Sequence, residues 1–258
     1  MLDQFVIFGD SITEGCFSQE RGFACGAALA DDYKRRLDVI NRGFGGYTTQ
    51  QARYILPETI PLGCKIRLLW IFFGANDAAL PGKLQHVPLE SYKENLVYLI
   101  RNASLKAHNP DVKIIVVTPG PIDEYLTDSD DRTAEHTQKY AHAAAGVARE
   151  CGVPCVDLWG AFMRFAGWQE GQPLIGSKKL PQNAKLDDLV YDGLHFSPGG
   201  YRILYNEVTR TIAQHFPELA SQKLPMSLID WSAKPAMEVT KEDLFPKNGQ
   251  RISFMQNI

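Results

Sequence analysis

Five strand-like apolar segments alternate with helical patterns along residues 1–217, and this alternation restricts the fold more than any other feature. The segments cover residues 4–8, 37–41, 66–73, 112–118 and 153–158. Runs such as LLWIFF and IIVV lack the polar alternation of a half-exposed strand, which is typical of strands buried on both faces. Strands joined by helical crossovers lie parallel in one sheet with helices on both sides. The sequence therefore predicts an α/β domain with a five-stranded parallel sheet.

Helical patterns fill the intervals between these segments. They are expected over 21–36, after YTTQQA, from about Pro88, over 133–151 and from Pro198. In the third of these, apolar residues recur at a helical period as far as Ala103. Gly152 is expected to stop the fourth helix, and Ser197 to cap the last one with Pro198 at its first position.

Residues 218–258 differ from the rest of the chain. They contain Pro225, Pro235 and Pro246 with scattered apolar residues, namely Leu228, Ile229, Trp231, Leu244, Phe245 and Phe254. Their apolar residues follow neither a helical nor a strand period. We expect one domain over 1–217 and an extended tail over 218–258 that packs on the domain or on a partner subunit. An apolar tail of this kind makes a homodimer a reasonable expectation.

Composition excludes several classes of function. A formal net charge of −3 gives no electrostatic basis for binding nucleic acid or an anionic membrane surface. We expect no signal peptide, since the N-terminus has no basic leader ahead of a long apolar stretch. We expect no membrane span either, since no apolar run approaches the length of a transmembrane helix. The five cysteines, Cys16, Cys25, Cys64, Cys151 and Cys155, form no C-x-x-C pair. They predict reduced thiols in a cytoplasmic protein and no metal site.

Chemistry-bearing residues follow the predicted strands. Ser11 comes after the first strand in FVIFGDSITEG, and NRGFGG (41–46) follows the second. Asn76 follows the third strand in GANDA, and Asp192 and His195 precede the last helix in YDGLHFSPGG. Open parallel sheets bind their ligands at the carboxyl ends of the strands, so we expect these residues at one edge.

Together these residues supply acyl transfer through a serine. Ser11 would be the nucleophile, His195 its base, and Asp192 the carboxylate that orients the imidazole. The backbone N–H groups of Ser11 and Gly46 and the amide of Asn76 would form the oxyanion hole. Each part has a plainer reading alone, as an N-cap, a turn, an Asx-turn or half of a metal site. Their complementary roles favour catalysis, which requires no metal and no organic cofactor.

The same motifs carry a family resemblance. GDSITEG, NRGFGG, GAND and DGLH resemble the four sequence blocks of the GDSL-type, or SGNH, hydrolases, across residues 5–216. The resemblance implies a three-layer α/β/α, flavodoxin-like fold with Ser11, Gly46, Asn76 and His195 as signature residues and Asp192 completing the triad. FFGANDAALP, VVTPGPIDE and DGLHFSPGGYRILYNEV are similar to the branch of isoamyl acetate-hydrolysing esterases. Gly120 stands where that branch has a third proline, so we expect a changed pocket lip.

The expected function is hydrolysis of short-chain esters, such as isoamyl acetate, through an acyl-serine intermediate. A carbohydrate acetylesterase, a lysophospholipase or thioesterase, and an acyltransferase are the alternatives within the fold. The alternative from another class is a non-catalytic, flavodoxin-like protein that binds a flavin or phosphate at GDSITEG. That reading needs a loop richer in Ser, Thr and Gly, and it gives Asp192 and His195 no role.

Overall fold

The computed structural model describes residues 2–127 and 130–244, and it contains the predicted sheet. Five parallel strands lie in the order β2-β1-β3-β4-β5. They are β1 (Gln4–Gly9), β2 (Asp38–Gly43), β3 (Ile66–Phe72), β4 (Lys113–Val117) and β5 (Cys155–Val156). This is the flavodoxin-like order of a doubly wound sheet, and it confirms the predicted fold class.

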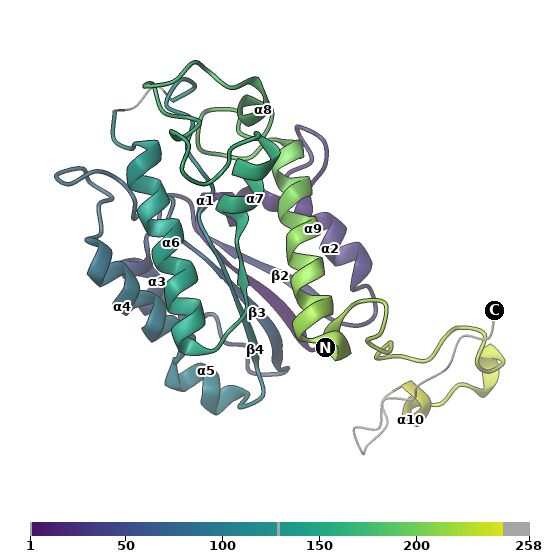
Figure 1. Cartoon of the computed structure of the whole chain (residues 1–258). Helices are drawn as coiled ribbons and strands as arrows, with labels where there is room; N and C mark the ends of the chain where they lie inside the picture. The colour runs from purple at the N-terminus through teal and green to yellow at the C-terminus, as the bar shows by residue number, and fades with distance from the viewer. Residues whose placement is uncertain (1, 128–129, 245–258) are drawn as a thin grey trace.

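Helices cover both faces of the sheet, as Figure 1 shows. On one face lie α2 (Cys25–Asp32), α7 (Leu158–Phe165) and α9 (Pro198–His215), and on the other α3 (Thr49–Glu58), α4 (Leu89–Ile100) and α6 (Ala134–Cys151). Shorter helices are α1 (Ser11–Glu14), α5 (Ala103–His108), α8 (Ala184–Asp187) and α10 (Lys241–Leu244). None of the helices in the described ranges has the length and hydropathy of a transmembrane span.

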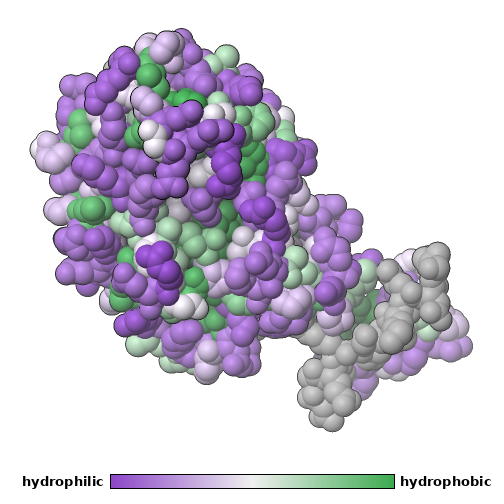
Figure 2. All heavy atoms as spheres, viewed as in Figure 1, coloured by the Kyte–Doolittle hydropathy of each residue, from purple (hydrophilic) through white to green (hydrophobic). Residues whose placement is uncertain are grey.

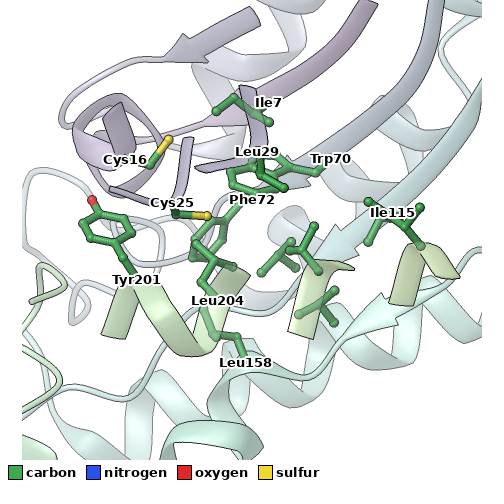
Figure 3. Packing of buried hydrophobic residues seen from close by; sticks show 14 of the residues in the cluster. Ile7, Cys16, Cys25, Leu29, Trp70, Phe72, Ile115, Leu158, Tyr201 and Leu204 are labelled. Carbon is green, nitrogen blue, oxygen red and sulfur yellow. The ribbon is translucent and has the colours of Figure 1, made fainter. Parts of the chain in front are cut away.

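The central strand β3 explains the continuous apolar run. Its successive side chains point to opposite faces, and each face lies under helices. Trp70 and Phe72 pack with Leu29 of α2 and Leu204 of α9 (Figure 3). Leu69 belongs instead to the cluster that includes side chains of α3, α4 and α6. A strand buried on both faces needs apolar residues at every position, which is what LLWIFF supplies.

Most predicted helices are present, and three boundaries differ. The first predicted helix, 21–36, is shorter in the structure and covers Cys25–Asp32. The helix from Pro88 ends at Ile100, because Asn102 caps a separate helix by accepting a hydrogen bond from the N–H of Leu105. The fifth strand keeps only two residues, because Asp157 caps α7 by accepting from the N–H of Gly160. Helix α7 was not predicted from the sequence.

The first part of the tail packs on the domain. Leu219 and Leu224 are buried in the same cluster as α2 and α9. The hydroxyl of Tyr33 donates to the carbonyl oxygen of Leu219 at 2.8 Å, and Nε of Arg36 donates to that of Leu224 at 2.8 Å. These contacts attach residues 219–224 to the end of α2 and the loop that follows it.

The second part of the tail leaves the domain. Figure 1 shows the chain running away from the sheet toward α10, and Trp231 and Met237 are 86% and 97% exposed. In Figure 2 the same segment stands off a main body whose visible face is mostly hydrophilic. Phe245 and Phe254, which the sequence also assigns to a packed tail, lie outside the described residues.

Candidate active site

Ser11 lies where β1 turns into α1. Asp10 caps this short helix, with its Oδ1 accepting a hydrogen bond from the N–H of Ile12 at 3.0 Å. The turn requires Gly9, since a Cβ there would lie 2.1 Å from Thr13 Oγ1 and 2.5 Å from the carbonyl oxygen of Phe72. Ser11 is therefore held at the carboxyl edge of the sheet, in the first turn of a helix.

The structure brings Ser11, His195 and Asp192 together in one hydrogen-bonded chain. Ser11 Oγ lies 2.8 Å from His195 Nε2. His195 Nδ1 lies 2.7 Å from Asp192 Oδ2. Ser11 and His195 come from segments 184 residues apart, which the sheet edge places side by side. The sequence predicted this grouping.

Hydrogen bonds within the loop from Asp192 to His195 fix its conformation. Asp192 Oδ1 accepts hydrogen bonds from the N–H groups of Leu194 at 3.0 Å and His195 at 2.7 Å. Burial alone would raise the pKa of Asp192, but these bonds and the one from the imidazole outweigh it and lower the pKa, so the carboxylate is ionised. Gly193 has φ +85°, and its carbonyl oxygen accepts from the N–H of Asp123 at 2.9 Å. A side chain at Gly193 would meet the Asp123 carbonyl oxygen at 2.5 Å.

The NRGFGG loop is bonded to the segment that follows Ser11. Asn41 Nδ2 donates to the carbonyl oxygen of Glu14 at 3.0 Å, and Glu14 Oε2 accepts from the N–H of Gly45. Gly43 lies so close to α1 that a Cβ would come within 2.0 Å of the Glu14 nitrogen. Gly46 has φ +76°, a left-handed conformation that favours glycine. The Gly46 backbone thus has the conformational freedom that the predicted oxyanion loop needs.

Asn76 is buried beside the same loop. Its Nδ2 donates to the carbonyl oxygen of Tyr47 at 2.9 Å. The next residue, Asp77, accepts from the N–H of Thr49 at 3.0 Å and from its hydroxyl, which joins the third strand end to α3. Burial raises the pKa of Asp77 to about 7, with the Thr49 hydrogen bonds acting in the opposite direction. Asn76 and Gly46 therefore lie in adjoining, mutually bonded loops.

Comparison with known proteins identifies the family. The profile of the GDSL-like lipase/acylhydrolase family matches residues 7–203. The chain belongs to this family. It is a carboxylic ester hydrolase, as the resemblance of its four motifs predicted.

Similar proteins match over nearly the whole chain. A GDSL esterase/lipase of Arabidopsis thaliana is 36% identical over 87% of this chain and 90% of its own. The isoamyl acetate-hydrolyzing esterase of Saccharomyces cerevisiae is 33% identical over 89% of this chain and 94% of its own. Among solved structures, a lipase/acylhydrolase from Enterococcus faecalis superposes with a TM-score of 0.61 at 27% identity. That structure is covered over 96% of its length by 83% of this chain.

A cavity of about 220 Å³ opens beside Ser11 and His195 in this hydrolase. It is lined by segments 11–23 and 191–201, which the sequence analysis had not assigned to a pocket. The ring of Tyr191 stacks on the imidazole of His195 with centroids 6.0 Å apart. The guanidinium of Arg21 lies 3.9 Å from the centroid of the Tyr191 ring. The cavity wall is thus aromatic next to the histidine and charged at Arg21.

Gly120, where the resemblance predicts a third proline, lies against a residue of the cavity wall. A Cβ at Gly120 would meet the ring of Phe196 at 2.9 Å, and Phe196 is a buried residue of the cavity wall. Phe196 also packs against Phe162, with ring centroids 4.8 Å apart. The missing side chain at Gly120 therefore gives the Phe196 ring its place in the wall.

Cys16 is the nearest competitor of Ser11 as a nucleophile, and its environment opposes that role. Its side chain is fully buried, and burial raises the pKa of the thiol to about 12. A protonated, inaccessible thiol is a poor nucleophile. Within residues 2–127 and 130–244, His, Cys, Asp and Glu side chains do not gather in groups of three that could hold a metal ion.

Proposed function

We propose that this protein is a serine esterase that hydrolyses short-chain carboxylic esters, such as isoamyl acetate, through an acyl-serine intermediate. The 2.8 Å contact between Ser11 Oγ and His195 Nε2 is the observation that carries the proposal. A relative 33% identical to this chain hydrolyses isoamyl acetate by its name, which supports the choice of ester.

Acylation follows from the bonded chain of three side chains. As Ser11 Oγ attacks the carbonyl carbon, His195 Nε2 accepts the hydroxyl proton. Asp192, kept ionised by its hydrogen bonds, stabilises the imidazolium through His195 Nδ1. His195 then returns the proton to the alcohol oxygen as its bond to the acyl carbon breaks. The alcohol leaves and the acyl group stays on Ser11.

The oxyanion of the tetrahedral intermediate would accept three hydrogen bonds. Ser11 contributes a backbone N–H from the first turn of α1, where such groups have no partner within the helix. Gly46 contributes a second N–H, and Asn76 contributes an N–H of its amide. Donors of this kind lower the barrier because they meet the charge where it develops, and each is typically worth about 3 kcal/mol.

Deacylation repeats these steps with water. The oxygen of a water molecule attacks the acyl carbon while His195 takes a proton from that water. The tetrahedral intermediate collapses, and the proton passes to Ser11 Oγ as the carboxylic acid leaves. An alcohol in place of water would give transesterification through the same acyl-enzyme.

The experiment is a rate series on 4-nitrophenyl and isoamyl esters from acetate to dodecanoate, with wild-type protein and Ser11→Ala. We expect short acyl chains to be preferred and Ser11→Ala to lose the activity. An unchanged rate in Ser11→Ala would refute the serine mechanism. A maximum at dodecanoate would keep the mechanism and favour a lysophospholipase or thioesterase instead.

We further propose that the protein is cytoplasmic, binds no nucleic acid and forms a homodimer. The five free thiols support a reducing compartment. The exposed Trp231 and Met237 support a tail that buries apolar surface on a partner subunit. Light scattering of the full chain and of a chain ending at residue 230 tests the dimer, which the shorter chain should fail to form. The same ratio of measured mass to single-chain mass in both samples would count against the dimer.

A further inference from the structure

Two side chains outside the four motifs connect the loops that carry Asn76 and Gly46. Arg132 is buried, and its Nη2 donates to Asn76 Oδ1 at 3.2 Å and to Gln85 Oε1 at 2.6 Å. Its Nε donates to the carbonyl oxygen of Ala75 at 2.8 Å. Gln85 Nε2 in turn donates to the carbonyl oxygen of Gly46 at 2.8 Å. The Arg132 guanidinium therefore contacts Asn76 directly and is linked to the Gly46 loop through Gln85.

These bonds fix the direction of the Asn76 amide. A guanidinium only donates hydrogen bonds, so the oxygen of the amide must face Arg132. The nitrogen then faces the other way and donates to the carbonyl oxygen of Tyr47 at 2.9 Å. A flipped amide would set donor against donor at Arg132 and acceptor against acceptor at Tyr47. Asn76 thus keeps its N–H groups on the side of the Gly46 loop.

Gln85 holds the Gly46 peptide in a similar way. The carbonyl oxygen of Gly46 is bonded to Gln85, and the N–H of Gly45 is bonded to Glu14. The peptide that carries the Gly46 N–H lies between these two anchored peptides. Glycine at φ +76° has no side chain to restrain it, so these bonds restrict the direction of its N–H.

The charge of Arg132 also affects the donors. Its Nη1 forms an ion pair with Asp131 Oδ2 at 2.6 Å, and only 7% of the Arg132 side chain is exposed. A charged donor on Asn76 Oδ1 draws electron density from the amide and strengthens its N–H groups as donors.

We propose that Arg132, together with Gln85, is a positioning residue that aligns the oxyanion donors Asn76 and Gly46. This inference rests on the proposed serine esterase. A positioning role acts on the transition state, so it lowers kcat and leaves KM nearly unchanged. A purely structural role would instead lower the melting temperature and leave kcat of the folded protein unchanged.

The test is a double-mutant cycle between Arg132→Lys and Asn76→Ala. Lysine keeps the charge but loses the forked donors. Removing one oxyanion donor costs about 10²–10³ in kcat, and we expect about 10²-fold for Arg132→Lys. In the Asn76→Ala background the same change should cost no more than about tenfold, since only its action on Gly46 through Gln85 remains. Arg101→Lys, at an exposed arginine, is the matched control.

Gln85→Leu gives an independent measurement, because Gln85 is only half-buried and the variant is not expected to unfold. We expect kcat to fall about tenfold, with the affinity for an alkyl trifluoromethyl ketone, which forms an oxyanion adduct on the serine, falling in parallel. Gln214→Leu, at an exposed glutamine, is the control.

The outcomes distinguish failure of the positioning role from failure of the proposed function. Equal losses from Arg132→Lys with and without Asn76, or unchanged kcat and inhibitor affinity in Gln85→Leu, would overturn the positioning role. If Arg132→Lys does not fold, the Gln85→Leu result alone decides. Full activity in Ser11→Ala, measured beside these variants, would instead refute the proposed function.

Discussion

Replacing Asp192 with asparagine should reverse the proton arrangement of His195. Two backbone N–H groups, of Leu194 and His195, donate to Oδ1, so the oxygen of an asparagine must take that position. Its Nδ2 then faces His195 Nδ1, where Oδ2 lies in the wild type at 2.7 Å. The imidazole has to accept there and carry its proton on Nε2. In that tautomer it cannot take the proton of Ser11.

The size of this effect follows from the tautomer and the exposure of the carboxylate. The same change in a comparable Ser-His-Asp triad costs about 10⁴ in kcat, or roughly 5.5 kcal/mol of barrier. The Asp192 side chain is 42% exposed, so water can compete for His195 Nδ1 and restore part of the active tautomer. We therefore expect a loss of about 10³–10⁴ in kcat, with KM changed less than about threefold.

Initial rates on 4-nitrophenyl acetate across a range of concentrations measure both constants. Asp188→Asn is the matched control, because this exposed aspartate lies in the same loop outside the hydrogen-bonded chain. The control should keep wild-type kcat. A kcat of Asp192→Asn within about threefold of wild type would show that the carboxylate does not set the tautomer, and the reasoning would fail.

Four further results are expected. The value of kcat/KM should be highest for acetate to hexanoate esters and fall steeply by about ten acyl carbons, since a chain that exceeds the pocket causes strain; rising rates at longer chains would contradict this. Cys16→Ala should keep its labelling by a fluorophosphonate, and loss of labelling in a folded variant would contradict the choice of nucleophile. Burial and the neighbouring Asp187 raise the pKa of Asp123 from 3.8 to about 7, so the folded state holds a proton that the unfolded state releases, and stability falls as the pH rises from about 4 to 7. Melting curves of Asp123→Asn should lose part of that slope, and curves parallel to wild type would exclude the effect. Deleting residues 218–258 should lower the melting temperature by roughly 10 °C through loss of Leu219 and Leu224 from the core, whereas deletion from residue 232 takes neither leucine away and should lower it less.

The strands and the helix caps could be predicted because their sequence signals are local. Apolar runs marked the strands, and Ser197 with Pro198 marked the start of α9. Gly152 ends α6 in the left-handed conformation, as its position predicted. Helix α7 was missed because its cap, Asp157, directly follows a strand of only two residues. No turn or polar segment separates the strand pattern from the helical pattern there.

The motifs of the candidate site could be predicted from the sequence, but the residues that position them could not. Ser11, Asp192 and His195 are recognisable by residue type and by their place after strands or before a helix. Arg132 has no such signal, since its hydrogen bonds to Asn76 and Gln85 span 56 and 47 residues and depend on how three loops pack. Gln85 likewise lies in a connecting segment without periodicity. Contacts between loops become visible only in three dimensions.

The most direct test of the account is the intact mass of the protein after reaction with a fluorophosphonate, followed by peptide mapping. We expect one adduct per chain, located on Ser11 and absent from Ser11→Ala. Protection by a short-chain ester during the reaction would place the adduct in the substrate site. An adduct on another residue, or equal labelling of Ser11→Ala, would contradict the claim that Ser11 is the nucleophile.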